Sequence, residues 1–128
     1  MTFVESARVS ELYELFRSGT RLLEAGDFHA ATVPLGRARE LDPSKDSIRE
    51  AYGRALFGAR RFAEAAEEFG AIVEHAPTDH YALFCLGRAL QQLGRHADAR
   101  APLAQAARLQ PQRADYELYR ERAFRAAA

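Results

Sequence analysis

The chain has 128 residues, which is enough for one compact domain and too short for two domains with separate hydrophobic cores. Its 18 basic and 18 acidic side chains cancel, so no overall field attracts nucleic acid or an anionic membrane. No apolar run approaches the roughly 18 residues that span a bilayer, and the lone cysteine, Cys85, cannot form an internal disulfide. We therefore expect a single-domain cytoplasmic protein with no membrane-spanning segment.

After an N-terminal extension over residues 1–11, which either lengthens the first helix or frays, the chain repeats itself every 34 residues. The period is visible in three ladders of equivalent positions: Gly19, Gly53 and Gly87; Ala31, Ala65 and Ala99; and Pro43, Pro77 and Pro111. The ladders divide the chain into units over residues 12–45, 46–79 and 80–113.

Each unit is expected to form a pair of helices. Apolar residues recur at steps of three and four, as in Leu83, Leu86 and Leu90, and so share one helix face. A break follows at Gly26 or Gly94, where glycine can adopt the positive φ that ends a helix, and each ladder proline ends the second helix. The ladder glycines and alanines keep the paired helices close. A lone pair would leave apolar surface exposed, so the pairs are expected to stack.

The spacing of apolar residues over residues 114–128 predicts a seventh helix. Tyr116, Tyr119 and Ala123 lie on one stripe, and charged residues occupy the other positions. Such a helix would cap the last pair by covering its apolar side. The alternative is a helix that swaps between chains or forms a dimer interface.

This pattern resembles the tetratricopeptide repeat (TPR), whose signature runs aromatic-x-x-Leu-Gly-x-x-Tyr, then Ala-x-x-x-Phe, then Pro. The third unit matches at Leu83, Leu86, Gly87, Leu90, Ala99, Leu103 and Pro111, and the second at Tyr52, Gly53, Leu56, Ala65, Phe69 and Pro77. Arg49 and Ser18 depart from the pattern at apolar positions. The resemblance implies an all-α fold over residues 1–128: a right-handed superhelix of three helix-turn-helix repeats plus a C-terminal capping helix.

In TPR proteins the first helix of each pair lines the inner surface of the superhelix, so the resemblance also implies a ligand-binding groove. By helical phase, the groove would be formed by Tyr13, Phe16, Arg17, Thr20 and Leu23 of the first unit, Ser47, Glu50, Arg54 and Phe57 of the second, and Tyr81, Phe84, Arg88 and Gln91 of the third. Aromatic rings give rigid contact area, and arginine binds carboxylates through two parallel hydrogen bonds. This surface suits a peptide with apolar anchors and an acidic group. Alternatively, these aromatic side chains pack against neighbouring pairs.

One TPR subclass grips the C-terminal carboxylate of chaperones with lysine, asparagine and arginine on the same inner helices. This chain does not resemble that subclass. The corresponding positions hold Phe16, Thr20, Ala51, Tyr81 and Cys85. We therefore do not expect a chaperone tail as the ligand.

Catalysis is not expected, because no nucleophile, base and orienting group occur at usable spacing. The four histidines, His29, His75, His80 and His96, are scattered and form no metal-ligand cluster with Cys85 or a carboxylate. We expect Cys85 to be a small packing residue and not a reactive thiol activated by Arg88 one turn away. The sequence therefore predicts no enzyme, no cofactor and no metal.

The function that best fits these features is a non-catalytic adaptor that binds a peptide or protein segment in the groove. The alternative is a structural scaffold that self-associates, as a homodimer for example, through the C-terminal helix or the convex face. Nucleic-acid binding is disfavoured, because the arginines of the C-terminal third scatter over several helix faces. Those residues are Arg95, Arg100, Arg108, Arg113, Arg120, Arg122 and Arg125.

Overall fold

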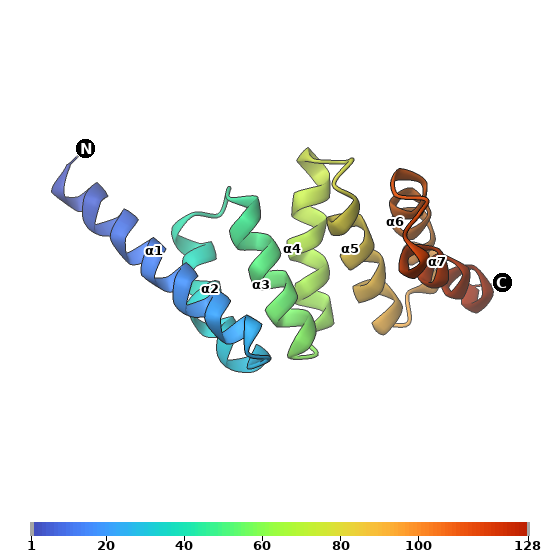
Figure 1. Ribbon diagram of the computed structural model, residues 1–128, viewed down its shortest axis with the longest axis horizontal. Helices are drawn as coiled ribbons and strands as arrows, with labels where there is room; N and C mark the ends of the chain where they lie inside the picture. Colours follow the sequence, from blue (N-terminus) through green and yellow to red (C-terminus); the bar gives the residue numbers. More distant parts are fainter. Residues whose placement is uncertain (1, 128) are drawn as a thin grey trace. The chain divides into compact units, whose positions relative to one another are not determined.

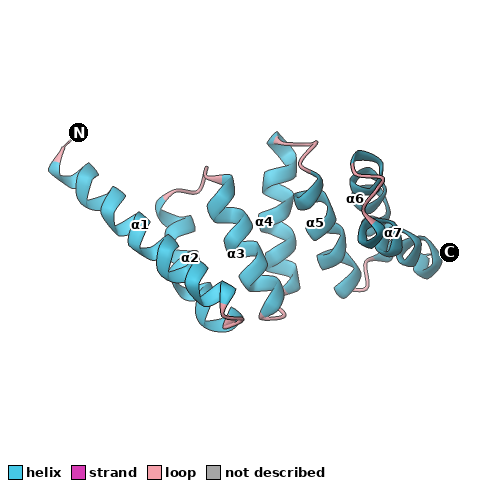
Figure 2. Ribbon diagram, in the orientation of Figure 1, coloured by secondary structure: helices cyan, strands magenta, loops and turns pink. Residues whose placement is uncertain are grey.

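The computed structural model describes residues 2–127, and in that range it contains seven α-helices and no strand (Figure 2). The helices are α1 (Phe3–Glu24), α2 (Phe28–Leu41), α3 (Asp46–Gly58), α4 (Phe62–His75), α5 (His80–Gln92), α6 (His96–Leu109) and α7 (Ala114–Ala127). Short turns join them. The expected all-α class and the succession of helix-turn-helix units are therefore confirmed.

The chain divides into two compact units, Met1–Arg61 and Phe62–Ala128, whose helices are labelled in Figure 1. In the first unit α2 packs against both α1 and α3, and α1 also contacts α3. In the second unit α5 packs against α4 and α6, and α7 packs against α6 and contacts α5. Each unit thus contains one complete helix pair, α1–α2 or α5–α6, and the helix that follows this pair, α3 or α7. The second unit also contains α4.

The N-terminal extension lengthens the first helix. Thr2 caps α1: its hydroxyl accepts a hydrogen bond from the Glu5 amide at 3.1 Å, and the Glu5 carboxylate accepts one from the Thr2 amide at 3.2 Å. This reciprocal pair satisfies two amides that a helix start otherwise leaves unpaired. The side chains of residues 2–11 are nevertheless all exposed, because no other helix of the first unit covers these turns (Figure 1).

Each turn between paired helices contains one residue with a positive φ, in the left-handed region. Gly26 and Gly94 end the first helices of the complete pairs with φ of 79° and 76°. Arg60, at the equivalent position after α3, adopts the same conformation with φ of 66°. A side chain in this region costs about 1–2 kcal/mol, so the middle turn is more strained than the other two.

Close helix packing within each complete pair depends on a glycine facing a leucine. A Cβ added to Gly19 would lie 2.4 Å from Cγ of Leu35, and one added to Gly87 would lie 2.4 Å from Cγ of Leu103. Both leucines are fully buried. The two pairs therefore share one packing rule, in which the leucine of the second helix occupies the volume that a side chain on the first would need.

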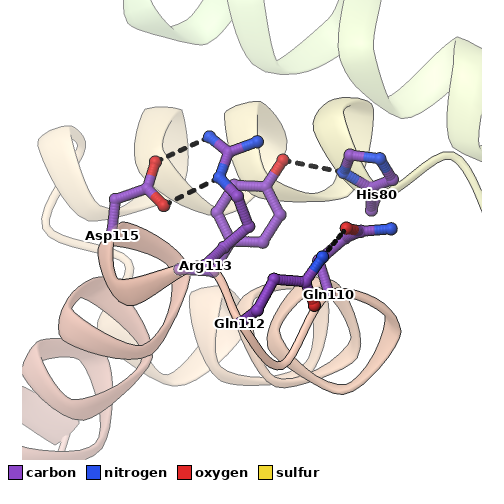
Figure 3. Close-up of polar contacts among 6 residues, drawn as sticks. His80, Gln110, Gln112, Arg113 and Asp115 are labelled. Carbon is purple, nitrogen blue, oxygen red and sulfur yellow. Dashed lines mark hydrogen bonds and ion pairs between the residues drawn. The ribbon is translucent and has the colours of Figure 1, made fainter.

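The C-terminal helix α7 is held by a fully buried tyrosine, Tyr116. Its ring stacks on Phe84 of α5 with a centroid separation of 4.5 Å, and a hydrogen bond of 2.8 Å joins its hydroxyl to Nδ1 of His80. Arg113 lies over the same ring at 4.3 Å and donates two hydrogen bonds, of 3.0 and 2.8 Å, to Asp115 (Figure 3). Further along α7, Ala123 joins the apolar cluster of α5 and α6. The helix thus packs on its own chain, as a cap does.

We expect Gly87→Ala to lower the free energy of unfolding by about 1–3 kcal/mol, because the added methyl group overpacks against Leu103. Gly70→Ala is the matched control. Gly70 also lies in a helix, but an added Cβ there meets no atom within 4 Å. That change should stabilise the protein by about 0.5–1 kcal/mol through the helix preference of alanine. Urea unfolding followed by circular dichroism measures both, and equal effects of the two substitutions would contradict the packing assignment.

Burial raises the pKa of the Tyr116 hydroxyl above its usual value. The unfolded chain therefore releases this proton at lower pH than the native protein does, so the stability that Tyr116 contributes is complete below about pH 10 and falls as the pH rises further. We expect unfolding free energy above pH 10 to decline more steeply in the parent than in Tyr116→Phe, which keeps the ring. Parallel curves for the two proteins would show that the hydroxyl is not buried in the native state.

Candidate functional site

The residues predicted to form the groove all lie on three helices. Tyr13, Phe16, Arg17 and Thr20 are on α1, Glu50, Arg54 and Phe57 on α3, and Tyr81, Phe84, Arg88 and Gln91 on α5. The first two groups belong to the first compact unit and the third group to the second. The surroundings of the groups differ.

In the first unit, a pocket of about 230 Å³ lies between α1 and α3. It is lined by Phe16, Thr20, Leu23 and Glu24 of α1 and by Ser47, Glu50, Ala51 and Arg54 of α3. The structure thus brings together six of the residues named from helical phase. Tyr13, Arg17 and Phe57 do not line the pocket, although Tyr13 is 61% exposed on the same helix.

Two lining residues, Glu24 and Ala51, were not assigned to the groove from the sequence. Ala51 is nearly fully buried and belongs to the apolar cluster of the unit, against which Phe16 packs. The signal that could have found it is its size, because a small residue on a helix that faces another helix leaves space. Glu24 is the last residue of α1, where helical phase is a weaker guide.

The pocket combines an apolar floor with a polar rim. Phe16, Leu23 and Ala51 supply the apolar atoms, whereas Glu50 is half-buried and Arg54 is exposed. Thr20 uses its hydroxyl within α1, where it donates a hydrogen bond of 3.1 Å to the Arg17 carbonyl. Such a site can enclose an apolar side chain while its rim binds polar or charged groups next to that side chain.

In the second unit, the predicted groove residues contact α7. Arg88 lies 3.9 Å above the centre of the Tyr119 ring, and Phe84 meets the same ring edge-on at 5.7 Å. Gln91 donates a hydrogen bond of 3.0 Å to the Tyr119 carbonyl and accepts one of 3.1 Å from Arg88. Burial lowers the pKa of Arg88. These three side chains therefore have partners inside the unit, which favours the α1/α3 pocket as the candidate site.

A second hollow, of about 290 Å³, lies between α6 and α7. Its lining is more polar and comprises Ala104, Ala107, Arg108, Pro111, Glu117 and Arg120. Arg120 donates two hydrogen bonds to Glu117, which lowers the pKa of that carboxyl group. Because its main charged groups already pair with each other, this hollow is the weaker candidate.

Among the residues that the structure describes, no three His, Cys, Asp or Glu side chains lie close enough together to hold a metal ion. Cys85 is half-buried on α5. No helix in the described range is both long enough and apolar enough to cross a membrane.

A sequence model of the tetratricopeptide repeat matches residues 16–80 and again residues 51–114. The two matches together cover most of the chain, which therefore belongs to the tetratricopeptide repeat family. Among curated protein sequences, none is a significant match to the chain.

Solved structures of other TPR proteins have the same fold. A MamA RS-1 double mutant superposes with a TM-score of 0.83 at 21% identity over 88% of this chain, and this chain covers 63% of it. The first TPR of Spaghetti (RPAP3), bound to the HSP90 peptide SRMEEVD, gives 0.82 at 17% identity and coverage of 92% and 94%. PcrH in complex with the chaperone binding region of PopB gives 0.70 at 17% identity and coverage of 90% and 93%.

Proposed function

We propose that this protein is a non-catalytic adaptor that binds a peptide or protein segment across α1 and α3. The observation that carries the proposal is the pocket between these helices, because six of its eight lining residues lie at positions that the TPR resemblance assigns to a ligand groove. Two of the similar structures are complexes, one with an HSP90 peptide and one with the chaperone binding region of PopB. They support a binding role for this fold.

The chemistry of the pocket suggests what such a segment contains. Phe16 offers aromatic contact area next to the apolar floor. Arg54 is exposed at the rim and can bind a carboxylate with two parallel hydrogen bonds. We therefore propose a ligand with an apolar anchor and a nearby acidic group.

A chaperone tail is not the proposed ligand. Thr20 and Ala51 line the pocket at positions where tail-binding TPR domains carry residues that hold the terminal carboxylate. Neither side chain is charged, and the Thr20 hydroxyl already donates to its own helix. The peptide SRMEEVD is thus a useful negative control.

We expect Arg54→Ala to weaken peptide binding by about 10- to 100-fold, because a charge-assisted contact contributes roughly 1.5–3 kcal/mol. The probe is a peptide selected from a random library displayed on phage, and fluorescence anisotropy measures its affinity. Arg37→Ala is the control. Arg37 is an exposed arginine of α2 that pairs with Glu11 and Glu40 outside the pocket. Equal affinities of the two variants for every selected peptide would reject the α1/α3 face as the binding site.

Arg88→Ala should behave differently from Arg54→Ala. Arg88 contacts Tyr119 and Gln91 within the second unit, so its loss should lower stability more than it lowers peptide affinity. Thermal melting and the same anisotropy assay separate the two effects.

Self-association is a second proposal, and the exposed apolar side chains of the terminal helices favour it. Phe3 and Val4 on the first turn of α1 are 88% and 64% exposed, and Leu118 and Phe124 on α7 are 44% and 41% exposed. A large exposed apolar side chain can pack against a second copy of the chain. Light scattering should then give a mass that rises with protein concentration. Leu118→Ser or Phe3→Ser should reduce this rise. A constant monomer mass for the parent would reject this proposal.

A further inference from the structure

The two compact units contain the same helix arrangement at a fixed sequence offset. The pair α1 and α3 corresponds to the pair α5 and α7 after two periods of 34 residues, or 68 positions. Phe16 then corresponds to Phe84, and Arg54 to Arg122, so the residue type is kept at both positions. Thr20 corresponds to Arg88 and Ala51 to Tyr119, so at these two positions small side chains replace large ones.

In the second unit, the large side chains fill the space between the helices. The Tyr119 ring meets Phe84 edge-on at 5.7 Å, with Arg88 at 3.9 Å and Arg122 at 5.0 Å from the ring centre. Both guanidinium groups lie within the distance at which a cation is attracted to an aromatic face. The protein thus already binds an electron-rich ring at this position, using a ring of its own.

In the first unit, the corresponding ring and one guanidinium are missing. Ala51 and Thr20 line the pocket of about 230 Å³ at that place. An apolar cavity of about 150 Å³ is large enough to take up benzene, and pockets for drug-sized ligands are about 300–1,000 Å³. The volume between α1 and α3 therefore fits one aromatic side chain better than a whole small molecule.

We infer that the α1/α3 pocket receives an aromatic side chain, preferentially tyrosine, from the bound segment, in the place that Tyr119 occupies between α5 and α7. Phe16 and Arg54 remain at the positions from which Phe84 and Arg122 contact that ring. The Ser47 hydroxyl and the Glu50 carboxylate in the lining can accept a hydrogen bond from a phenol. This favours tyrosine over phenylalanine and both over leucine. The inference rests on the proposed function and adds the identity of the anchoring side chain.

The direct test uses N-acetyltyrosinamide as the probe, with N-acetylleucinamide as the matched aliphatic probe, and follows backbone amide shifts by NMR. The expected shifts gather at Phe16, Thr20, Ala51 and Arg54, and the tyrosine probe should bind about 3- to 10-fold more tightly than the leucine probe. Equal affinities, or shifts spread over both units, would overturn the inference.

Two substitutions that copy the second unit provide the control. Ala51→Tyr places a ring on α3 at the position of Tyr119, and Thr20→Arg places a guanidinium on α1 at the position of Arg88. Ala51→Tyr should abolish probe binding at Phe16, because the added ring occupies the place of the probe. Thr20→Arg should instead strengthen binding of the tyrosine probe, because it adds the second guanidinium that faces the ring in the second unit. Because Ala51 is nearly fully buried, Ala51→Tyr can disturb folding, whereas Thr20 is half-exposed and tolerates a long side chain. Thermal melting identifies a misfolded variant, and a folded Thr20→Arg protein that binds the tyrosine probe more weakly than the parent would overturn the inference.

Failure of the inference can be told apart from failure of the proposed function. Selected peptides that depend on Arg54 but keep their affinity when tyrosine is changed to leucine would overturn the aromatic anchor and leave the adaptor role intact. Peptides that ignore Arg54 would reject the proposed face, whatever the isolated tyrosine probe does.

Discussion

The contact between a ladder glycine and a buried leucine is the constraint on which the rest of the structure depends. Gly19 against Leu35 and Gly87 against Leu103 let two helices approach more closely than any side chain at the glycine would permit. Since α2 packs against both α1 and α3, the position of α2 decides how α1 meets α3. In the second unit α6 stands in the same relation to α5 and α7. The candidate site is therefore a consequence of packing elsewhere in the unit.

Equivalent helices enclose packed side chains in the second unit and a pocket in the first, and side-chain size accounts for the difference. Tyr119 completes the packing of the second unit by contacting Phe84 and Arg88. Ala51, at the equivalent position, leaves a pocket beside Phe16. Exchanging one large residue for a small one can therefore turn a packing position of a repeat protein into a pocket.

Much of the fold could be predicted from the sequence, because the 34-residue period and the apolar steps follow directly from helix geometry. The helix carrying each groove residue was equally predictable. The partners of Phe84, Arg88 and Gln91 were not, since they depend on where the Tyr119 ring docks. The extension of α1 to Phe3 carried a signal that apolar periodicity misses, namely threonine at position 2 with glutamate three residues later. The pocket beside Ala51 is harder still to predict, because it is space that small side chains leave unfilled and not a contact that particular residues make.

We propose that the ligand binds to α1 and α3 of the first unit. A crystal structure of the protein with a phage-selected peptide tests it most directly. We expect the peptide to contact Phe16 and Arg54 and to insert an aromatic ring beside Ala51. A peptide seated between α6 and α7, with the pocket beside Ala51 empty, would contradict it.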